Sequence, residues 1–340
     1  MRINIDTASI KPMTAWLEER KRGNTDEKKL MEILELPQYK TELARYASVL
    51  PVCGISKEEA KDFFINFDKK EFDNPRLQIK KPMFLDFYNN MDAMLKKAAF
   101  FEELGEEDVT LILKLLSAAL PDAMLEEEDD FNVMLTVSIG NSQGYPYDNN
   151  IVFDVATFDA FPDKDSLVHV LAHEIHHVFF NSLVPEEISS QQLFALNFAF
   201  EGLAMHFCNN AETKLKPKKY PELAQYTTCE ADFALYDSEF DQLFDEFKQL
   251  LYSSASMTQE EVYKLIADKY ERFGYISRID GSSHSIMQYP TYYLGCFFWG
   301  SIDLSLGKAA LIATLNEPAF FITNYNEAAG RLGYAARYRL

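Results

Sequence analysis

Apolar residues recur at helical spacing through most of the first 130 residues, with charged residues between them. This spacing is typical of amphipathic helices that bury one face. It predicts six helices, over residues 13–19, 28–36, 39–50, 58–67, 83–103 and 106–120. The acidic run at residues 126–130 then interrupts the pattern and indicates a solvated loop. We therefore expect an N-terminal helical region over residues 1–130.

The pattern changes at residue 131. β-branched and other apolar residues dominate residues 132–139 and 151–156, and turn-forming residues fill the segment between them. This combination predicts two strands, which form either a hairpin or neighbours in one sheet. Helical spacing returns from residue 166 onward. The predicted fold class is therefore α+β, mainly α, with a second domain over residues 131–340.

Two of the predicted helices, over residues 166–183 and 190–209, are apolar on almost every side. Helices of this kind are buried. Yet the first carries four of the six histidines in the chain, and the second carries a single acid, Glu201. Buried polar groups need partners, and an uncompensated buried carboxylate is costly. These side chains therefore indicate a functional site.

The first of these helices contains the motif HExxH, as His173-Glu174-Ile175-His176-His177. Residues four apart share one face of a helix, so His173 and His177 can present imidazole nitrogens to one metal ion. Glu174 can accept a proton from a water that zinc activates and pass it to a leaving amine. The motif predicts hydrolysis of peptide bonds with Glu174 as the general base.

Two protein ligands leave a tetrahedral zinc site incomplete, because a catalytic zinc usually has three ligands and a water. Glu201 is the best third candidate, since it stands alone among apolar residues on the following helix. The metal would also offset the cost of burying its carboxylate. We expect one zinc ion per chain, held by His173, His177 and Glu201.

The sequences HEIHH and EGLA, at residues 173–177 and 201–204, resemble the gluzincin branch of the zincin metallopeptidases. More narrowly, they are similar to a bacterial family of zinc-dependent peptidases with an HExxH…EGLA pattern. The stretches YYLG at 292–295 and PAFF at 318–321 resemble the same group. The resemblance covers roughly residues 132–330.

This resemblance implies a zincin-like core, in which a small sheet, the HExxH helix and a glutamate-bearing helix surround the metal. It also implies an edge strand that binds extended substrate by backbone pairing, and residues 132–139 or 151–156 would be that strand. The acid that thermolysin-type enzymes place four residues after Glu201 is replaced by Met205. Support for His173 must therefore come from another residue.

Gluzincins often supply a tyrosine or histidine that stabilises the oxyanion opposite the zinc. We take Tyr293 as this catalytic residue, because its predicted helix could place a tyrosine over the site. Tyr292, Tyr289 and His284 are alternatives, and a plain core position is a competing interpretation for each tyrosine.

Three further side chains have open roles. His169 lies one turn before His173, where it could support the site or be buried and hydrogen-bonded on its own. His176 points about 100° away from His177 and is expected to be structural. Asp154 could support a ligand, but we expect it on the surface.

The formal net charge of −20 makes nucleic acid an unexpected partner, because an acidic surface repels phosphate. The sequence contains no apolar run of about 18 residues, so we expect no membrane span. No secretory signal is evident, and the four cysteines are widely spaced, as in proteins of a reducing compartment. We expect a cytoplasmic protein that acts on a peptide or protein substrate, with its oligomeric state open.

Two other interpretations compete with a zinc peptidase. The zinc site could belong to a catalytically silent scaffold that binds a partner, although an intact Glu174 argues against this. A helical interaction protein could carry the motif by accident. It would then have to satisfy four buried histidines and two glutamates without a metal ion.

Overall fold

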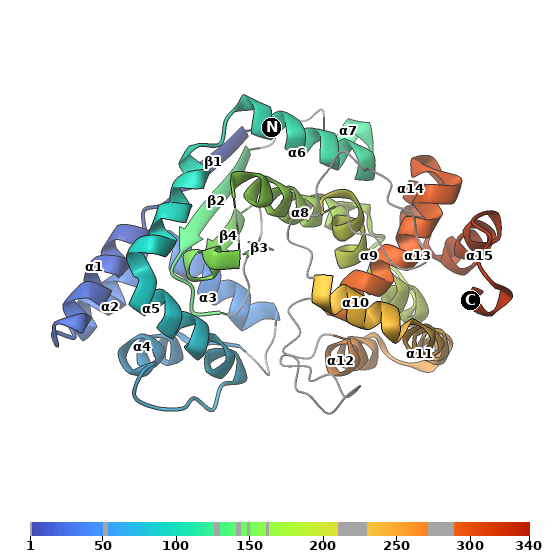
Figure 1. Cartoon of the computed structure of the whole chain (residues 1–340). Helices are drawn as coiled ribbons and strands as arrows, with labels where there is room; N and C mark the ends of the chain where they lie inside the picture. Colours follow the sequence, from blue (N-terminus) through green and yellow to red (C-terminus); the bar gives the residue numbers. More distant parts are fainter. Residues whose placement is uncertain are drawn as a thin grey trace. The chain divides into compact units, whose positions relative to one another are not determined.

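The structure, a computed structural model, describes residues 2–49, 54–125, 130–140, 144–147, 150–160, 163–209, 230–270 and 289–340. The chain divides into two compact units. Figure 1 labels the helices and strands of the chain. Unit 1 consists of Met1–Val109 and Glu127–Leu167, and unit 2 of Thr110–Glu126 and Val168–Leu340. The fold is mainly helical with one small mixed sheet, which confirms the predicted α+β class.

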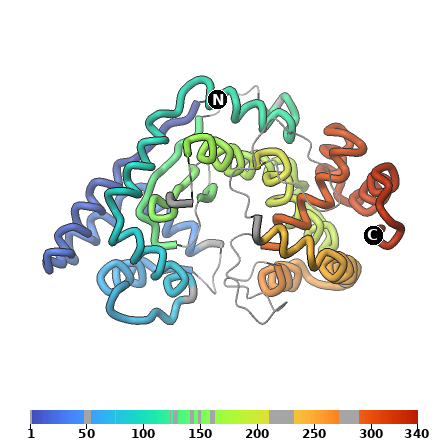
Figure 2. The backbone as a smooth tube through the Cα atoms, viewed as in Figure 1, coloured from blue at the N-terminus to red at the C-terminus, as the bar shows by residue number. Residues whose placement is uncertain are grey.

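The sheet of unit 1 has the strand order β1-β2-β4-β3. Its strands are β1 (Arg2–Asp6), β2 (Asp130–Thr136), β3 (Gly144–Tyr147) and β4 (Asn150–Asp154). β2 runs parallel to both β1 and β4, whereas β3 is antiparallel to β4. Figure 2 shows the N-terminal strand in dark blue beside the green strands that follow it much later in the chain.

The edges of this sheet differ from those expected. The predicted strands 132–139 and 151–156 correspond to β2 and β4, and both are interior strands of the described sheet. The prediction that one of them is an edge strand is therefore wrong. The edges are β1, in a region expected to be helical, and β3, in the segment assigned to turns. Pro146 fits the edge strand β3, because proline has no backbone N–H to donate to a further strand.

Five helices accompany the sheet in unit 1. They are α1 (Ile10–Lys21), α2 (Glu27–Ile33), α3 (Pro37–Val49), α4 (Lys57–Asn66) and α5 (Pro75–Glu102). Side-chain caps define several starts, such as the Ser56 hydroxyl that accepts the Glu59 N–H of α4. Aromatic rings fill the space between α4 and α5, where Phe63 and Phe84 have centroids 5.2 Å apart. The helices predicted over residues 13–103 are therefore present, although the same region also contains the strand β1.

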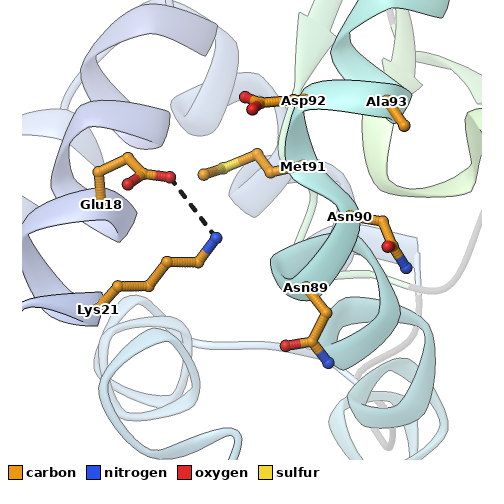
Figure 3. Close-up of a pocket in the computed structure, with 7 residues that line it drawn as sticks. All are labelled: Glu18, Lys21, Asn89, Asn90, Met91, Asp92 and Ala93. Carbon is orange, nitrogen blue, oxygen red and sulfur yellow. Dashed lines mark ion pairs between the residues drawn. The ribbon is translucent and has the colours of Figure 1, made fainter.

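The long helix α5 is interrupted at Asn90, whose φ of −116° and ψ of 24° are not helical. A pocket of about 250 Å³ lies beside this interruption, between α1 and α5 (Figure 3). Glu18 and Lys21 line it from α1 as an ion pair of 3.5 Å, and residues 89–93 line it from α5. Most of these residues are exposed, so the pocket is a polar hollow on the surface of unit 1.

Buried charges join α3 and α5 to the sheet. Lys80 of α5 pairs with Asp154 at the end of β4, and both side chains are fully buried. Asp154 also accepts the Ser138 N–H at 2.9 Å, while Glu42 of α3 accepts the Ser138 hydroxyl and, at 3.1 Å, the Ile139 N–H. The expectation that Asp154 lies on the surface is therefore wrong, because a lysine far away in the chain compensates its burial.

Unit 2 is helical. Its helices are the greater part of α6 (Glu106–Ala119), α7 (Asp122–Leu125), most of α8 (Lys164–Leu183), α9 (Ser190–Phe207), α10 (Glu230–Ser238), α11 (Phe240–Ser253), α12 (Gln259–Lys269), α13 (Pro290–Leu306), α14 (Lys308–Asn316) and α15 (Phe321–Arg331). The helices α9 and α13 pack most closely, with α11 and α12 against α9, and α14 and α15 against α13. α8 and α9 match the two apolar helices predicted from the sequence.

Of the helices in the described part of the chain, none combines the length and the apolar character that a bilayer crossing requires.

Burial raises the pKa of Glu42 to about 7, despite hydrogen bonds that favour its charged form. The folded protein therefore keeps a proton that the unfolded chain releases near pH 4.5. The bound proton contributes to the free energy of unfolding. This contribution is fully present below about pH 4.5 and is lost as the pH rises toward 7. We expect this group to lower the free energy of unfolding by on the order of 3 kcal/mol across that range.

Glu42→Gln should remove this part of the pH dependence, and urea denaturation at pH 5 and pH 8 measures it. Asp154, whose pKa burial also raises, contributes in the same direction to both proteins. Glu32→Gln, at an exposed side chain, controls for the loss of one carboxylate. The same pH dependence in Glu42→Gln and in the unaltered protein would contradict the prediction.

Candidate metal centre

Two helices of unit 2 bring the three predicted metal-binding residues together. His173 and His177 lie one turn apart on α8, and Glu201 lies on α9. The Oε2 atom of Glu201 is 3.1 Å from His173 Nε2 and 3.2 Å from His177 Nε2. The three groups can each offer one ligand atom, and these atoms all lie within 4.8 Å of one another.

The donor atoms fit a tetrahedral zinc ion in both kind and spacing. Imidazole nitrogen and carboxylate oxygen are common zinc ligands, and two ligands at bond lengths of about 2.1 Å lie about 3.4 Å apart on a tetrahedron. The separations of 3.1 and 3.2 Å from Glu201 to the two histidines are within a few tenths of an ångström of this value. Both histidines are buried, and the Glu201 side chain is 20% exposed, so the cluster keeps one partly open side.

The charges within the cluster stabilise one another. Burial alone would raise the pKa of Glu201, but the imidazoles of His177 and His173 lower it well below its ordinary value. Burial alone would lower the pKa of His173, but hydrogen bonding and charge from Glu201, followed by the charge of Glu174, raise it. The carboxylate of Glu201 is therefore held ionised against the two rings.

Glu174 is a second acid beside this cluster. Its residue is only 8% exposed, and it is near enough to influence the pKa of His173. The thiol of Cys208 is affected as well, since burial and then the charge of Glu174 raise its pKa. The charge of Glu174 thus acts on both His173 of the cluster and Cys208 at the end of α9.

The other two histidines of α8 are buried and have structural contacts. His169 donates from Nδ1 to the Cys208 carbonyl oxygen, as expected for a buried, hydrogen-bonded histidine. His176 packs against Phe180, with centroids 5.8 Å apart. Burial, with the charge of His177, holds the pKa of His176 well below its ordinary value, so this ring stays neutral.

The residue that supports His173 is Asn209, which the sequence did not indicate. The Nδ1 atom of His173 lies 2.7 Å from Asn209 Oδ1. Met205 is buried, and its neighbour His206 instead pairs with Asp303 of α13 at 2.9 Å. Asn209 comes two residues after the end of α9, where helical periodicity no longer predicts the direction of a side chain.

Adjacent tyrosines of α13 have different surroundings. Tyr292 is part-buried and stacks on His173, with ring centroids 6.2 Å apart and an angle of 19° between the rings. Tyr293 is fully buried, and its hydroxyl donates to Asp237. Its ring also packs against Phe233 at 5.4 Å. The tyrosine that the structure brings to the histidines is therefore Tyr292, and Tyr293 lies in an aromatic cluster.

The remaining candidates for the oxyanion donor are Tyr289 and His284. Tyr289 lies next to Tyr292, with ring centroids 6.3 Å apart. His284 lies outside the described residues.

The backbones of α9 and α13 touch directly beside the metal-binding glutamate candidate. A Cβ atom added at Gly202, the residue after Glu201, would lie 2.1 Å from the carbonyl carbon of Gly295. A Cβ atom added at Gly295 would lie 1.8 Å from the backbone oxygen of Phe198. Only glycine fits at either position, and this contact holds the helices of Glu201 and Tyr292 together.

A profile of the family described as "Putative zinc dependent peptidase (DUF5700)" matches residues 30–333. The chain belongs to this family. This membership confirms the resemblance to the family of zinc-dependent peptidases inferred from HEIHH and EGLA, and the matched residues include the three candidate metal ligands. No curated protein and no solved structure matches the chain significantly.

Gly295→Ala should destabilise unit 2 by at least about 2 kcal/mol, because the added methyl group has to displace backbone rather than a flexible side chain. Thermal unfolding followed by circular dichroism measures the effect. Gly105→Ala is the matched control, since its new Cβ would have its nearest neighbour at 4.0 Å. Equal unfolding midpoints for the two variants would show that α9 and α13 are not in this close contact.

Proposed function

We propose that the protein is a zinc-dependent metallopeptidase of the gluzincin type. In this proposal His173, His177 and Glu201 hold one zinc ion per chain, and Glu174 is the general base. The observation that carries it is the convergence of two imidazole nitrogens and one carboxylate oxygen within 4.8 Å. Membership in the zinc-dependent peptidase family supports a peptide or protein as the substrate.

When bound, zinc would supply Lewis-acid chemistry, polarising the scissile carbonyl and lowering the pKa of a water. Glu174 would take a proton from the attacking water on its carboxylate and deliver it to the nitrogen of the departing amine. Its burial beside His173 supports this role, since a buried carboxylate is partly shielded from bulk water.

Tyr292 is our candidate for the oxyanion donor, in preference to Tyr293. Its ring stacks on His173 and is part-buried, so it lies at the centre and still reaches solvent. A phenol hydroxyl in such a position can donate to an oxyanion that develops on the substrate. The hydroxyl of Tyr293 already donates to Asp237 within an aromatic cluster, which supports a structural role.

Other properties inferred from the sequence remain predictions. They are the cytoplasmic location, the division of the chain into domains near residue 130, and the absence of nucleic acid among the partners. The net charge of −20 favours cationic peptides among the possible substrates.

Glu174→Gln should abolish most peptide hydrolysis while zinc binding is retained, because the variant keeps all three proposed ligands and loses only the base. We expect the turnover rate to fall about 10²- to 10⁴-fold. Cleavage of a proteome-derived peptide library, read by mass spectrometry, measures the activity. Elemental analysis of the same samples measures the zinc content.

Glu186→Gln, an exposed acid after α8, is the matched control and should keep full activity. Zinc in the unaltered protein without any peptide cleavage would favour the silent scaffold over the peptidase. If the protein binds no zinc after incubation with excess metal, the proposed function is contradicted altogether.

Tyr292→Phe should lower the turnover rate about 10²- to 10³-fold with little change in the Michaelis constant, as expected when one oxyanion donor is removed. Tyr293→Phe makes the same chemical change one residue later. It should leave turnover intact and lower stability by about 2 kcal/mol, because the hydrogen bond from Tyr293 to Asp237 is lost. The opposite pattern in steady-state kinetics would restore the assignment to Tyr293.

A further inference from the structure

The two histidines of the centre are held by different contacts. His173 Nδ1 lies 2.7 Å from Asn209 Oδ1. His177 Nδ1 is buried with no hydrogen-bond partner among the described residues, and its ring lies flat on Phe200, at 3.8 Å between centroids and an angle of 7°. Stacking fixes the plane of the His177 ring, whereas the hydrogen bond of His173 also selects which nitrogen carries the proton.

A neutral imidazole has one N–H group and one nitrogen lone pair. An amide oxygen accepts hydrogen bonds and cannot donate them, so Asn209 Oδ1 requires the proton of His173 on Nδ1. Nε2, which hydrogen-bonds to Glu201 Oε2 at 3.1 Å, is then the nitrogen that would lose its proton and offer its lone pair when a metal binds. The hydrogen bond to Asn209 therefore leaves Nε2 as the metal-binding nitrogen of His173 in the cluster.

The position of Asn209 is itself defined by its neighbours. The residue before it, Cys208, accepts a hydrogen bond from His169 through its carbonyl oxygen. The N–H of Asn209 lies 3.3 Å from the Ala204 oxygen of α9. The segment after α9 is thus attached to α8 through two histidines one turn apart, His169 and His173. Because α9 also carries Glu201, these hydrogen bonds help to keep the Glu201 carboxylate next to the His173 imidazole.

We propose that Asn209 is a positioning residue of the metal centre, which holds His173 in the Nδ1–H tautomer and aims Nε2 at the metal. This inference rests on the proposed zinc site. It does not depend on peptide hydrolysis, because Asn209 acts on the metal through His173 and has no role with the substrate. An amide performs this task without adding a third carboxylate to a centre that already contains Glu174 and Glu201.

The test is metal affinity, measured on metal-free protein by competition with a chelator for Zn²⁺ and by titration with Co²⁺. Asn209→Leu keeps the size of the side chain and removes the acceptor. It should weaken binding about 10- to 100-fold. Asn209→Asp keeps an acceptor oxygen in the same place and should bind within about threefold of the unaltered protein or more tightly. The visible absorption of bound Co²⁺ should change in Asn209→Leu and be restored in Asn209→Asp.

Asn197→Leu is the matched control. Asn197 is a part-buried asparagine of α9, and its side chain donates to the Leu193 oxygen rather than contacting a histidine of the centre. It should leave metal affinity unchanged. Unaltered affinity and Co²⁺ absorption in Asn209→Leu would overturn the inference. An equal loss in Asn209→Leu and Asn209→Asp would overturn it too, because the acceptor would then be irrelevant.

A measurement on the unaltered protein covers the case in which Asn209→Leu does not fold. In zinc-loaded protein with ¹⁵N-labelled histidine, the spectrum should show the His173 ring protonated at Nδ1 and bound to metal at Nε2. Only six histidines contribute to this spectrum. Metal bound at Nδ1 would overturn the inference while leaving the peptidase proposal in place. If the Asn209 variants change metal affinity as expected but the unaltered protein cleaves no peptide, the inference stands and the peptidase proposal fails.

Discussion

The carboxylate of Glu201 is the group around which unit 2 is organised. It projects from α9, a helix that is apolar on almost every side, and a lone carboxylate in such surroundings is costly. Two imidazoles of α8 face it at 3.1 and 3.2 Å and keep it ionised. The three groups compensate one another only while α8 and α9 stay in register, so the chemistry of the centre and the packing of these helices are a single requirement.

The helices themselves and the three central side chains were predictable because their signals are local. HExxH places His173 and His177 on one face through helical geometry alone, and Glu201 stands out as the one acid in an apolar helix. Asn209 was not predictable, since it follows the end of α9 and depends on how the chain turns there. The choice between Tyr292 and Tyr293 depends on the rotation of α13, because neighbouring residues of a helix point about 100° apart.

In unit 1, too, the features of the sheet that depend on distant residues were not predictable from the sequence. β1 is a short strand whose partner, β2, begins more than a hundred residues later, so its pairing leaves no trace in nearby sequence. The edge strand β3 contains Gly144 and Pro146, which are also turn residues and were interpreted as such. Asp154 looks like a surface acid in isolation, and only its contact with Lys80 explains its burial. Partners distant in the chain account for each of these differences.

The glycine contact between α9 and α13 shows that two adjacent residues of the EGLA pattern, Glu201 and Gly202, are needed for unrelated reasons. In the proposed function the glutamate is a metal ligand, whereas Gly202 is required because the carbonyl carbon of Gly295 occupies the space of a side chain. Evolution could therefore exchange the glutamate for another ligand without disturbing the crossing of the helices. The two glycines, in contrast, constrain each other, and any drift at one position has to be matched by a shift of the helix that carries the other.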